Sequence, residues 1–294
     1  MVIVRIFGGL GNQLFEYAFG RALSLKKNTP LLLDYYDQIS RIDLNGEKLT
    51  KITNAFDLPV KLYAGKKRKE LIRRYNLDYI DRLIKWTYLK TKCVIGEDNY
   101  EHLQKKIKKY QNIYFVGYWQ GEHYFDEFKD VIKNDFKFKI ERQISNLEIY
   151  GEITESDSVS LHVRGGEDYT NNSFYRKLNV KYYLDAVKII SKTNSKLKTF
   201  VFTDNIDNVH RNYKELLKFS KIVNVQTAFR SDIVDLLLMS KCKHNIIANS
   251  TFSWWGAWLN NNPNKIVVTP KKWFNDESLK YYNEKMLPAT WHKI

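Results

Sequence analysis

The residues best suited to chemistry lie at 244–259, which read HNIIANSTFSWWGAWL. A short apolar run ends in Asn249, Ser250, Thr251 and Ser253, and three tryptophans follow. Hydroxyl groups and backbone N–H groups at the end of a strand and the start of a helix form an anion site. The same pattern is typical of an ordinary capped helix, because Ser and Thr are favoured N-caps. The segment therefore leaves two interpretations, a phosphate-bearing ligand or a plain helix cap.

A second polar run, residues 161–169 (LHVRGGEDY), follows a predicted strand. Arg164 has the side chain that best makes bidentate contacts to a phosphate. Glu167 and Asp168 are candidates for a general base, or they hold Arg164 by charge. The alternative is a surface turn whose acids offset the local positive charge.

Asp204 follows a further strand, 199–202, and is suited to accept hydrogen bonds from a base or a ribose, or to cap the next helix. The run TDNID around it is not the Asp-x-Asp that would chelate a nucleotide-bound metal. Neither Cys93 nor Cys242 has metal-ligand spacing, and no acidic or histidine cluster does. We therefore expect no metal site.

A glycine-rich turn at residues 8–12 (GGLGN) follows the first predicted strand. Glycine has no Cβ, so the backbone there can approach a ligand closely. The spacing departs from the G-x-G-x-x-G dinucleotide fingerprint, because Leu14 stands where the third glycine belongs. Asp34 lies near the distance of a ribose-binding acid, which leaves an NAD-dependent oxidoreductase as a less favoured alternative.

These motifs need a frame of strands and helices to position them. Strand, glycine turn, helix and strand over residues 2–33 predict a βαβ unit and hence a parallel sheet. A second alternating pattern begins at residue 158, after a polar linker candidate at 140–157. We predict an α/β fold with two domains, 1–150 and 151–294. In such sheets ligands bind at the carboxyl ends of the strands, where each motif above lies.

The chain of 294 residues has a net charge of +15, and residues 61–110 carry a large share of it. Apolar residues recur there at helical spacing among the cations, which indicates either peripheral contact with an anionic membrane or a helix docked on its own domain. We find no helix-turn-helix spacing, zinc ligand set or RNA-binding signature, and so expect no nucleic acid. The start MVIVRIFGG shows no signal-peptide pattern, which favours a cytoplasmic protein.

Several of these motifs together resemble the bacterial α-1,2-fucosyltransferases, family 11 of the glycosyltransferases. Residues 7–18 (FGGLGNQLFEYA) are similar to the family's opening signature, and 162–164 (HVR) to its His-x-Arg-Arg-x-Asp motif. Residues 245–259 resemble its third motif almost letter for letter, and 117–120 and 270–274 also fit. The resemblance spans essentially the whole chain.

The resemblance implies two Rossmann-like domains facing a cleft, the GT-B type, and inverting transfer of L-fucose from GDP-fucose to the 2-hydroxyl of a galactoside in a surface polysaccharide or oligosaccharide. It implies a metal-independent enzyme of O-antigen assembly, with a GDP-sugar donor and a glycan acceptor that can be lipid-linked at the inner membrane face. The implied catalytic residues are Arg164, Asp168 and Glu167. The implied donor-binding residues are His162, Arg164, Asp204, Asn249, Ser250, Thr251 and Ser253. The implied acceptor-side residues are Gly9, Gly11, Asn12 and Gln13.

The chain departs from the family at one place. Where the family has Arg-Arg-Gly-Asp-Tyr, residues 164–169 read RGGEDY, so the second arginine is missing and one residue is inserted. Arg164 matches the first arginine. The motif's aspartate matches either Glu167 or Asp168, which leaves the general base open between them. The departure also leaves open another GDP-deoxysugar, a deoxy relative of fucose, as donor.

Overall fold

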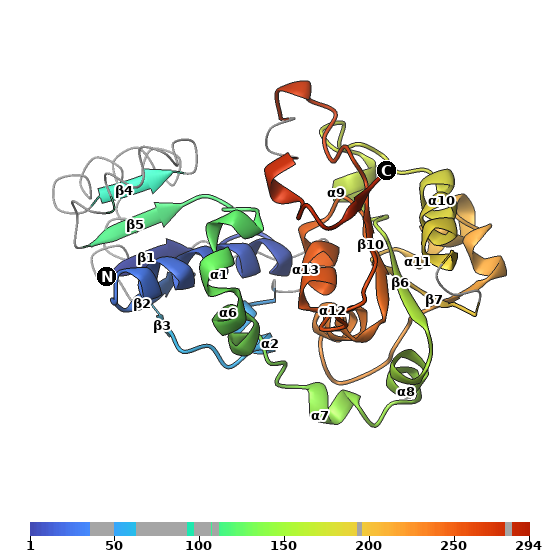
Figure 1. Cartoon of the computed structure of the whole chain (residues 1–294), viewed down its shortest axis with the longest axis horizontal. Helices are drawn as coiled ribbons and strands as arrows, with labels where there is room; N and C mark the ends of the chain where they lie inside the picture. The colour runs from blue at the N-terminus through green and yellow to red at the C-terminus, as the bar shows by residue number, and fades with distance from the viewer. Residues whose placement is uncertain (36–49, 63–92, 97–106, 108–111, 193–195, 280–283) are drawn as a thin grey trace. The chain divides into compact units, whose positions relative to one another are not determined.

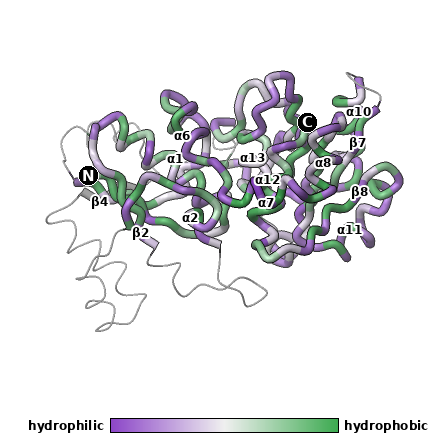
Figure 2. The backbone as a smooth tube through the Cα atoms, turned by 90° about the horizontal axis from the view of Figure 1, so that it is seen from below, coloured by the Kyte–Doolittle hydropathy of each residue, from purple (hydrophilic) through white to green (hydrophobic). Residues whose placement is uncertain are grey.

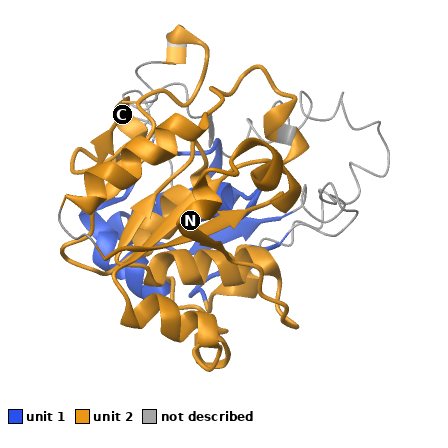
Figure 3. Ribbon diagram, turned by 90° about the vertical axis from the view of Figure 1, so that its right-hand side faces the viewer, with its two compact units in different colours: residues 1–51, 58–120, 124–135 blue, residues 52–57, 121–123, 136–294 orange. Residues whose placement is uncertain are grey.

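The computed structural model describes the chain except for residues 36–49, 63–92, 97–106, 108–111, 193–195 and 280–283. The chain divides into two compact units, coloured in Figure 3. Unit 1 comprises residues 1–51, 58–120 and 124–135. Unit 2 comprises residues 52–57, 121–123 and 136–294.

Unit 1 is built on a parallel sheet with the order β3-β2-β1-β5-β4 (Figure 1). Because β1 pairs with β2 on one side and β5 on the other, the glycine turn that follows β1 lies where the strand order reverses. Its elements are β1 (Val2–Arg5), α1 (Leu10–Lys26), β2 (Leu31–Asp34), β3 (Lys61–Leu62), β4 (Cys93–Gly96), β5 (Ile113–Val116), η4 (Asp126–Phe128) and α6 (Lys129–Asp135).

Helix α1 packs closely on this sheet because of a glycine in its middle. A Cβ at Gly20 would lie 2.5 Å from Cγ2 of Val4 in β1, so only glycine fits this approach. Phe19 stacks on Trp119, with ring centroids 3.9 Å apart, and both rings are buried. Each such buried side chain stabilises the fold by about 1.5–3 kcal/mol.

Unit 2 contains a second parallel sheet with the order β11-β10-β9-β6-β7-β8. Helices α12 and α13 lie on one face and α10 on the other (Figure 1). Its elements are α2 (Ile52–Ala55), α7 (Glu141–Ile144), α8 (Glu148–Glu155), β6 (Ser158–Val163), α9 (Glu167–Thr170), α10 (Val180–Ser191), β7 (Lys198–Thr203), α11 (Ile206–Asn212), η5 (Leu216–Lys218), β8 (Ser220–Ile222), α12 (Ser231–Lys241), β9 (His244–Ile246), α13 (Thr251–Leu259), β10 (Val267–Thr269), η6 (Glu277–Leu279) and β11 (His292–Lys293). The short η3 (Glu122–Tyr124) lies where the chain passes from unit 2 to unit 1.

The strand β6 lies at the centre of this sheet and is buried along its whole length. Burial on both faces is what a parallel strand covered by helices requires, and the hydropathy along the chain can be followed in Figure 2. Helix α13 covers one face with Trp254 and Trp255, which are fully buried. The indole N–H of Trp254 donates to the carbonyl of Met286 (3.0 Å), and that of Trp258 to Oε1 of Glu122 (2.8 Å). The two indole hydrogen bonds therefore anchor both turns of α13 on unit 2.

One predicted segment differs from expectation, and another lies mostly outside the described residues. The linker candidate at 140–157 holds the helices α7 and α8, whose Ile144 and Ile153 are buried in unit 2. Of the basic region 61–110, the structure describes β3, β4 and residue 107, so its predicted helix lies outside the described residues. Among the described residues, no helix is long and apolar enough to cross a membrane.

Candidate functional site

The carboxyl ends of β6, β7 and β9 bring Arg164, Asp204 and Asn249 to one edge of the unit 2 sheet. Strand β6 pairs with β7 on one side and β9 on the other, so the sequence order of the strands reverses between β6 and β9. Ligands of open parallel sheets bind at such a reversal. An Nη1 of Arg164 donates to the carbonyl of Asn249 across it, at 3.5 Å.

The guanidinium of Arg164 is held by two aromatic rings. Its Cζ lies 4.9 Å from the ring centroid of Tyr169 and 4.5 Å from that of Tyr175. Tyr169 is itself fixed, because its hydroxyl donates to the carbonyl of Arg176 (2.9 Å) and accepts the N–H of Leu178 (3.2 Å). Cation–π contacts engage the faces of a guanidinium, whereas its in-plane N–H groups are the donors that bind a phosphate. The arrangement therefore orients Arg164 for an anion.

The loop after Arg164 is fastened by Asp204 from β7. Oδ1 of Asp204 accepts the backbone N–H of Gly165 (2.6 Å) and of Gly166 (3.0 Å). The helix cap that was one alternative for Asp204 is instead Asn205, whose side chain accepts the N–H of Asn208. Whether Asp204 also contacts a donor stays a prediction.

Gly165, where the family's second arginine is missing, packs against α11. A Cβ at this position would lie 2.5 Å from Nδ2 of Asn208 and 3.1 Å from its Cβ. The Asn208 side chain is held in turn, because its Oδ1 accepts from Nδ2 of Asn212 (2.7 Å). This loop path therefore excludes a side chain at position 165, and sequence reasoning missed the contact because Asn208 carries no motif.

His162 lies in β6 and is buried, with its ring 5.8 Å from that of Phe252. Burial, together with the nearby positive charge of Arg164, lowers the pKa of His162 to about 3. Its Nδ1 has no hydrogen-bond partner among the described residues. The imidazole is therefore neutral at physiological pH and does not add positive charge beside Arg164.

The hydroxyl-rich turn joins β9 to α13. Nδ2 of Asn249 donates to the carbonyls of Arg176 (2.7 Å) and Trp273 (2.8 Å), so this amide ties two neighbouring segments together. Oγ of Ser250 accepts the N–H of Phe252 as the N-cap of α13, at 3.3 Å. Ser253 is buried and donates to the carbonyl of Ser250.

Helix α13 begins at Thr251, which is half-buried. The helix-cap interpretation of this turn is confirmed, and the anion-site interpretation stays a prediction. Ser250 caps the helix, and the first turn of α13 lies at the same sheet edge as Arg164.

The two candidate bases lie in the short helix α9, whose N-cap is Gly166. Glu167 is exposed. The backbone of Asp168 is part of α9, and its side chain lies outside the described residues. The choice of general base between them stays open.

In unit 1 the glycine turn has one position that requires glycine. Gly8 has φ +78°, in the left-handed region, and a Cβ there would also lie 2.8 Å from Nδ2 of Asn12. Nε2 of Gln13 donates to the carbonyls of Gly8 (3.1 Å) and Thr50 (2.7 Å). Oδ1 of Asn12 accepts from Nε2 of Gln120 (3.0 Å).

The two predicted glycines, Gly9 and Gly11, flank Leu10, the first residue of α1. Gly9 is the N-cap of α1 and Gly11 is buried in its first turn. The side chains of Asn12 and Gln13 thus hold the turn in shape. Their predicted acceptor role is not tested by these contacts.

The remaining alternatives find little support in the described residues. Asp34, the ribose acid of an NAD site, is 2% exposed and accepts the hydroxyl of Tyr114 (2.8 Å). A ribose could not reach it without displacing that contact. No group of three or more metal-binding side chains gathers within the described part of the chain.

Comparison with known proteins agrees with this arrangement. The family model described as glycosyl transferase family 11 matches residues 1–294. An α-1,2-colitosyltransferase of Escherichia coli is 32% identical over 300 residues, covering 100% of this chain and 99% of the relative. The O-antigen biosynthesis glycosyltransferase WbnK of Escherichia coli is 32% identical over 285 residues, covering 91% and 93%.

Solved structures of fucosyltransferases share the fold. NodZ α-1,6-fucosyltransferase soaked with GDP-fucose aligns with a TM-score of 0.51 at 15% identity, covering 88% of this chain and 92% of NodZ. A mutant of Arabidopsis thaliana FUT1 in complex with GDP aligns with a TM-score of 0.54 at 12% identity, covering 91% and 70%. The predicted α/β fold class is confirmed, with structural neighbours of the GT-B type. With its family model matched from end to end, the chain belongs to glycosyltransferase family 11.

Proposed function

We propose that this glycosyltransferase transfers a deoxysugar from its GDP ester, with inversion, to the 2-hydroxyl of a galactoside. The proposed donor is GDP-L-fucose or, as its alternative, GDP-colitose, which lacks one further hydroxyl. The observation that carries the proposal is Arg164, whose guanidinium contacts the neighbouring rings of Tyr169 and Tyr175 at the strand reversal of unit 2. The relative named as an α-1,2-colitosyltransferase and neighbours bound to GDP or GDP-fucose support a GDP-sugar.

The proposed reaction needs stabilisation of negative charge. As the bond between the anomeric carbon and the diphosphate oxygen breaks, the sugar becomes oxocarbenium-like and charge grows on the departing GDP. A cation fixed in advance at that diphosphate binds the transition state more strongly than the ground state, which accelerates the step. We assign this role to Arg164, aided by Ser250, Thr251 and Ser253 and the N–H groups of the first turn of α13.

Two of these three hydroxyls already have partners within the protein. Ser250 caps α13, and Ser253 donates to a carbonyl. We therefore assign the larger share of donor binding to the backbone N–H groups around Thr251, with the Ser250 hydroxyl available through its remaining donor capacity.

The acceptor hydroxyl attacks the anomeric carbon from the face opposite to the diphosphate. Its oxygen forms the new bond, and its proton passes to a carboxylate or to water. We propose Asp168 as the first candidate base and Glu167 as the second, because both follow Arg164 in the loop that Asp204 fastens. Replacing each with its amide, Asp168→Asn and Glu167→Gln, separates them, because the true base variant loses turnover while retaining GDP binding.

A donor and acceptor panel tests the proposed function. GDP-fucose, GDP-colitose, GDP-mannose and UDP-galactose are offered with β-galactoside acceptors, and the linkage of the product is determined by NMR. We expect transfer from one of the first two donors to O2. Transfer from UDP-galactose alone, or to another hydroxyl, would refute the proposed specificity. We also propose metal independence, which predicts unchanged rates in excess chelator.

We further propose a cytoplasmic enzyme that meets a lipid-linked acceptor at the inner membrane face. The relative named for O-antigen biosynthesis and the basic sequence 61–110 support this. Wild type and Arg73→Gln/Arg74→Gln should differ in sedimentation with anionic vesicles. Equal sedimentation would remove the basis for membrane contact through this region.

A further inference from the structure

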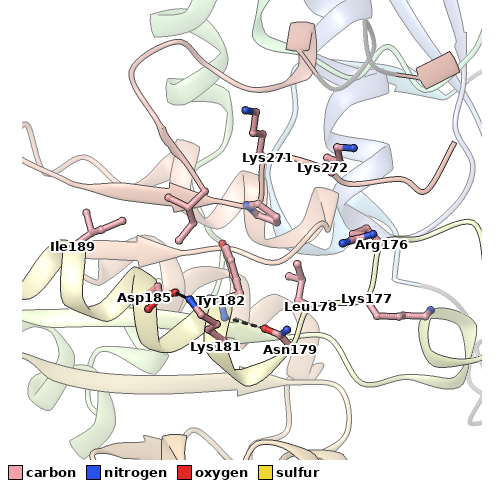
Figure 4. A pocket seen from close by; sticks show the side chains of 12 residues that line it. Arg176, Lys177, Leu178, Asn179, Lys181, Tyr182, Asp185, Ile189, Lys271 and Lys272 are labelled. Atoms are coloured by element: carbon pink, nitrogen blue, oxygen red, sulfur yellow. Dashed lines mark hydrogen bonds and ion pairs between the residues drawn. The ribbon is translucent and has the colours of Figure 1, made fainter. Parts of the chain in front are cut away.

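A pocket with cationic and apolar lining residues lies in unit 2. None of these lining residues is assigned a role in the proposed reaction. The pocket has a volume of about 640 Å³ and opens between α10 and residues 270–272, which follow β10 (Figure 4). The segment 176–179, which leads into α10, forms a further wall. All three walls belong to the same compact unit.

The side chains lining this pocket are strongly cationic. The lining contains one acidic side chain, Asp185, against five cations, which are Arg176, Lys177, Lys181, Lys271 and Lys272. Ile294 also lines the pocket, and its backbone oxygen accepts the N–H of Lys271 (2.7 Å). Figure 4 shows that the five cations come from all three walls. Gathering like charges around one cavity is unfavourable in the absence of counter-charge, and a bound anion removes that cost.

Internal ion pairs offset only part of this charge. Lys181 pairs with Asp185, and Lys272 with Glu277 at 2.6 Å. For Arg176 and Lys271, no carboxylate lies within ion-pair distance among the described residues. These two cations come from two neighbouring segments, because the N–H of Arg176 donates to the carbonyl of Trp273 (2.9 Å). An anion with more than one negative charge could contact both.

The start of α10 adds to the positive potential. This helix has 12 residues, is capped by Asn179, and has no acidic residue in its first turn. The positive end of its dipole therefore lies beside the cations. Lys181 lies in the same first turn, where the helix dipole disfavours a positive charge. The helix end by itself would not define a site, but here it lines the cavity with the cations.

The pocket also has an apolar side. Leu178, Ile189 and Pro270 line it together with the ring of Tyr182. The hydroxyl of Tyr182 is directed into the protein, where it donates to the carbonyl of Ile247 (2.7 Å). Tyr182 therefore contributes an apolar surface to the pocket. A purely inorganic anion would leave this surface unused.

We propose that this pocket binds a phosphate or diphosphate group carried on an apolar stem. The phosphate oxygens would contact Arg176, Lys181 and Lys271, and the stem would lie along Leu178, Ile189 and Pro270. The pocket adjoins the predicted GDP site, because the carbonyl of Arg176 accepts from Nδ2 of Asn249. None of the side chains proposed to contact the phosphate here is assigned to GDP. Binding in this pocket does not depend on the identity of the transferred sugar.

Binding of farnesyl diphosphate, below its micelle concentration, tests the proposal by isothermal titration calorimetry. Saturating GDP is present so that farnesyl diphosphate cannot bind at Arg164. The Arg164→Met variant is titrated in parallel, because it excludes binding at Arg164 even if GDP does not bind there. The pocket variant is Lys181→Gln/Lys271→Gln. The control is Lys214→Gln/Lys218→Gln, which removes the same charge from exposed lysines of unit 2 that do not line the pocket.

We expect wild type and control to bind farnesyl diphosphate and the pocket variant to bind roughly tenfold more weakly, because two charge-assisted contacts are removed. Equal affinity of wild type and pocket variant would overturn the proposal. Inorganic diphosphate should bind more weakly than farnesyl diphosphate, and equal binding would overturn the role of the apolar wall. Vesicles of phosphatidylglycerol distinguish the source of the phosphate. Sedimentation that is lost in the pocket variant would support a membrane headgroup, and farnesyl diphosphate binding alone would support a single soluble ligand.

Discussion

Replacing Gly165 with alanine should destabilise the loop that carries the proposed diphosphate site. The added Cβ would lie 2.5 Å from Nδ2 of Asn208, closer than real Cβ contacts allow. Asn208 is 8% exposed, and moving its side chain would disturb the 2.7 Å hydrogen bond from Asn212. Overpacking of this kind costs about 1–3 kcal/mol, and a lost hydrogen bond about 1 kcal/mol. We expect Gly165→Ala to lower the free energy of unfolding by about 1–2 kcal/mol, since the site lies near the surface and can partly relax.

A double-mutant cycle isolates this contact. Asn208→Ala removes the amide group that the new Cβ would meet, so the double variant should regain most of the stability lost in Gly165→Ala. For a protein of this size, each kcal/mol corresponds to about 2–4 °C in Tm. Differential scanning calorimetry on wild type, the two single variants and the double variant gives the coupling free energy between the two positions. The value of kcat/KM for the donor should fall in Gly165→Ala and recover in the double variant, because Gly165 adjoins Arg164. Strictly additive losses in the two single variants would refute the steric argument.

Three further changes have defined outcomes. Tyr175→Leu removes one cation–π contact of Arg164, which is worth about 0.5–2 kcal/mol. It should lower kcat/KM for the donor by about two- to thirtyfold without changing Tm by more than a few degrees. An unchanged kcat/KM would show that the ring does not orient Arg164. Burial and the charge of Arg164 lower the pKa of His162 to about 3, whereas the unfolded side chain titrates near 6.5. The stability present at neutral pH should therefore be lost as pH falls from about 6.5 toward 3, by up to about 1.4 kcal/mol per pH unit. Urea unfolding at several pH values measures this slope, and His162→Gln should flatten it. Trp254→Phe loses the hydrogen bond to Met286 and part of a filled core, and should cost about 1–3 kcal/mol in denaturant unfolding; a smaller loss would mean that the tryptophan does not anchor α13.

The sequence predicts the parallel sheets and their motifs well because the signals are local. The strand at Ser158–Val163 and the helix that begins at Thr251 follow from apolar runs bounded by polar residues, and the structure places them within a few residues of expectation. The rule that ligands meet the carboxyl ends of strands then brings Arg164 and Asn249 together. Their contact across β6 and β9 agrees with that reasoning.

The parts that escaped prediction depend on contacts between distant segments. Nothing in the local sequence shows that Tyr175 would face Arg164, or that Asn208 would fill the space beside Gly165. The polar and charged composition of 140–157 is typical of a linker. The buried side chains of Ile144 and Ile153 nevertheless attach α7 and α8 to unit 2. Side-chain packing of this kind is set by the tertiary fold, which overrides local composition.

The most direct test of the central claim compares donor binding and turnover in wild type, Arg164→Lys and the control Arg211→Lys. Lysine keeps the positive charge but lacks the planar fork of N–H donors. If Arg164 binds the diphosphate, Arg164→Lys should lose about 1.5–3 kcal/mol of transition-state stabilisation, which is at least about a tenfold fall in kcat/KM. The control Arg211→Lys changes an exposed residue of α11 and should keep the wild-type kcat/KM. Near-normal turnover and GDP affinity in Arg164→Lys would contradict the account.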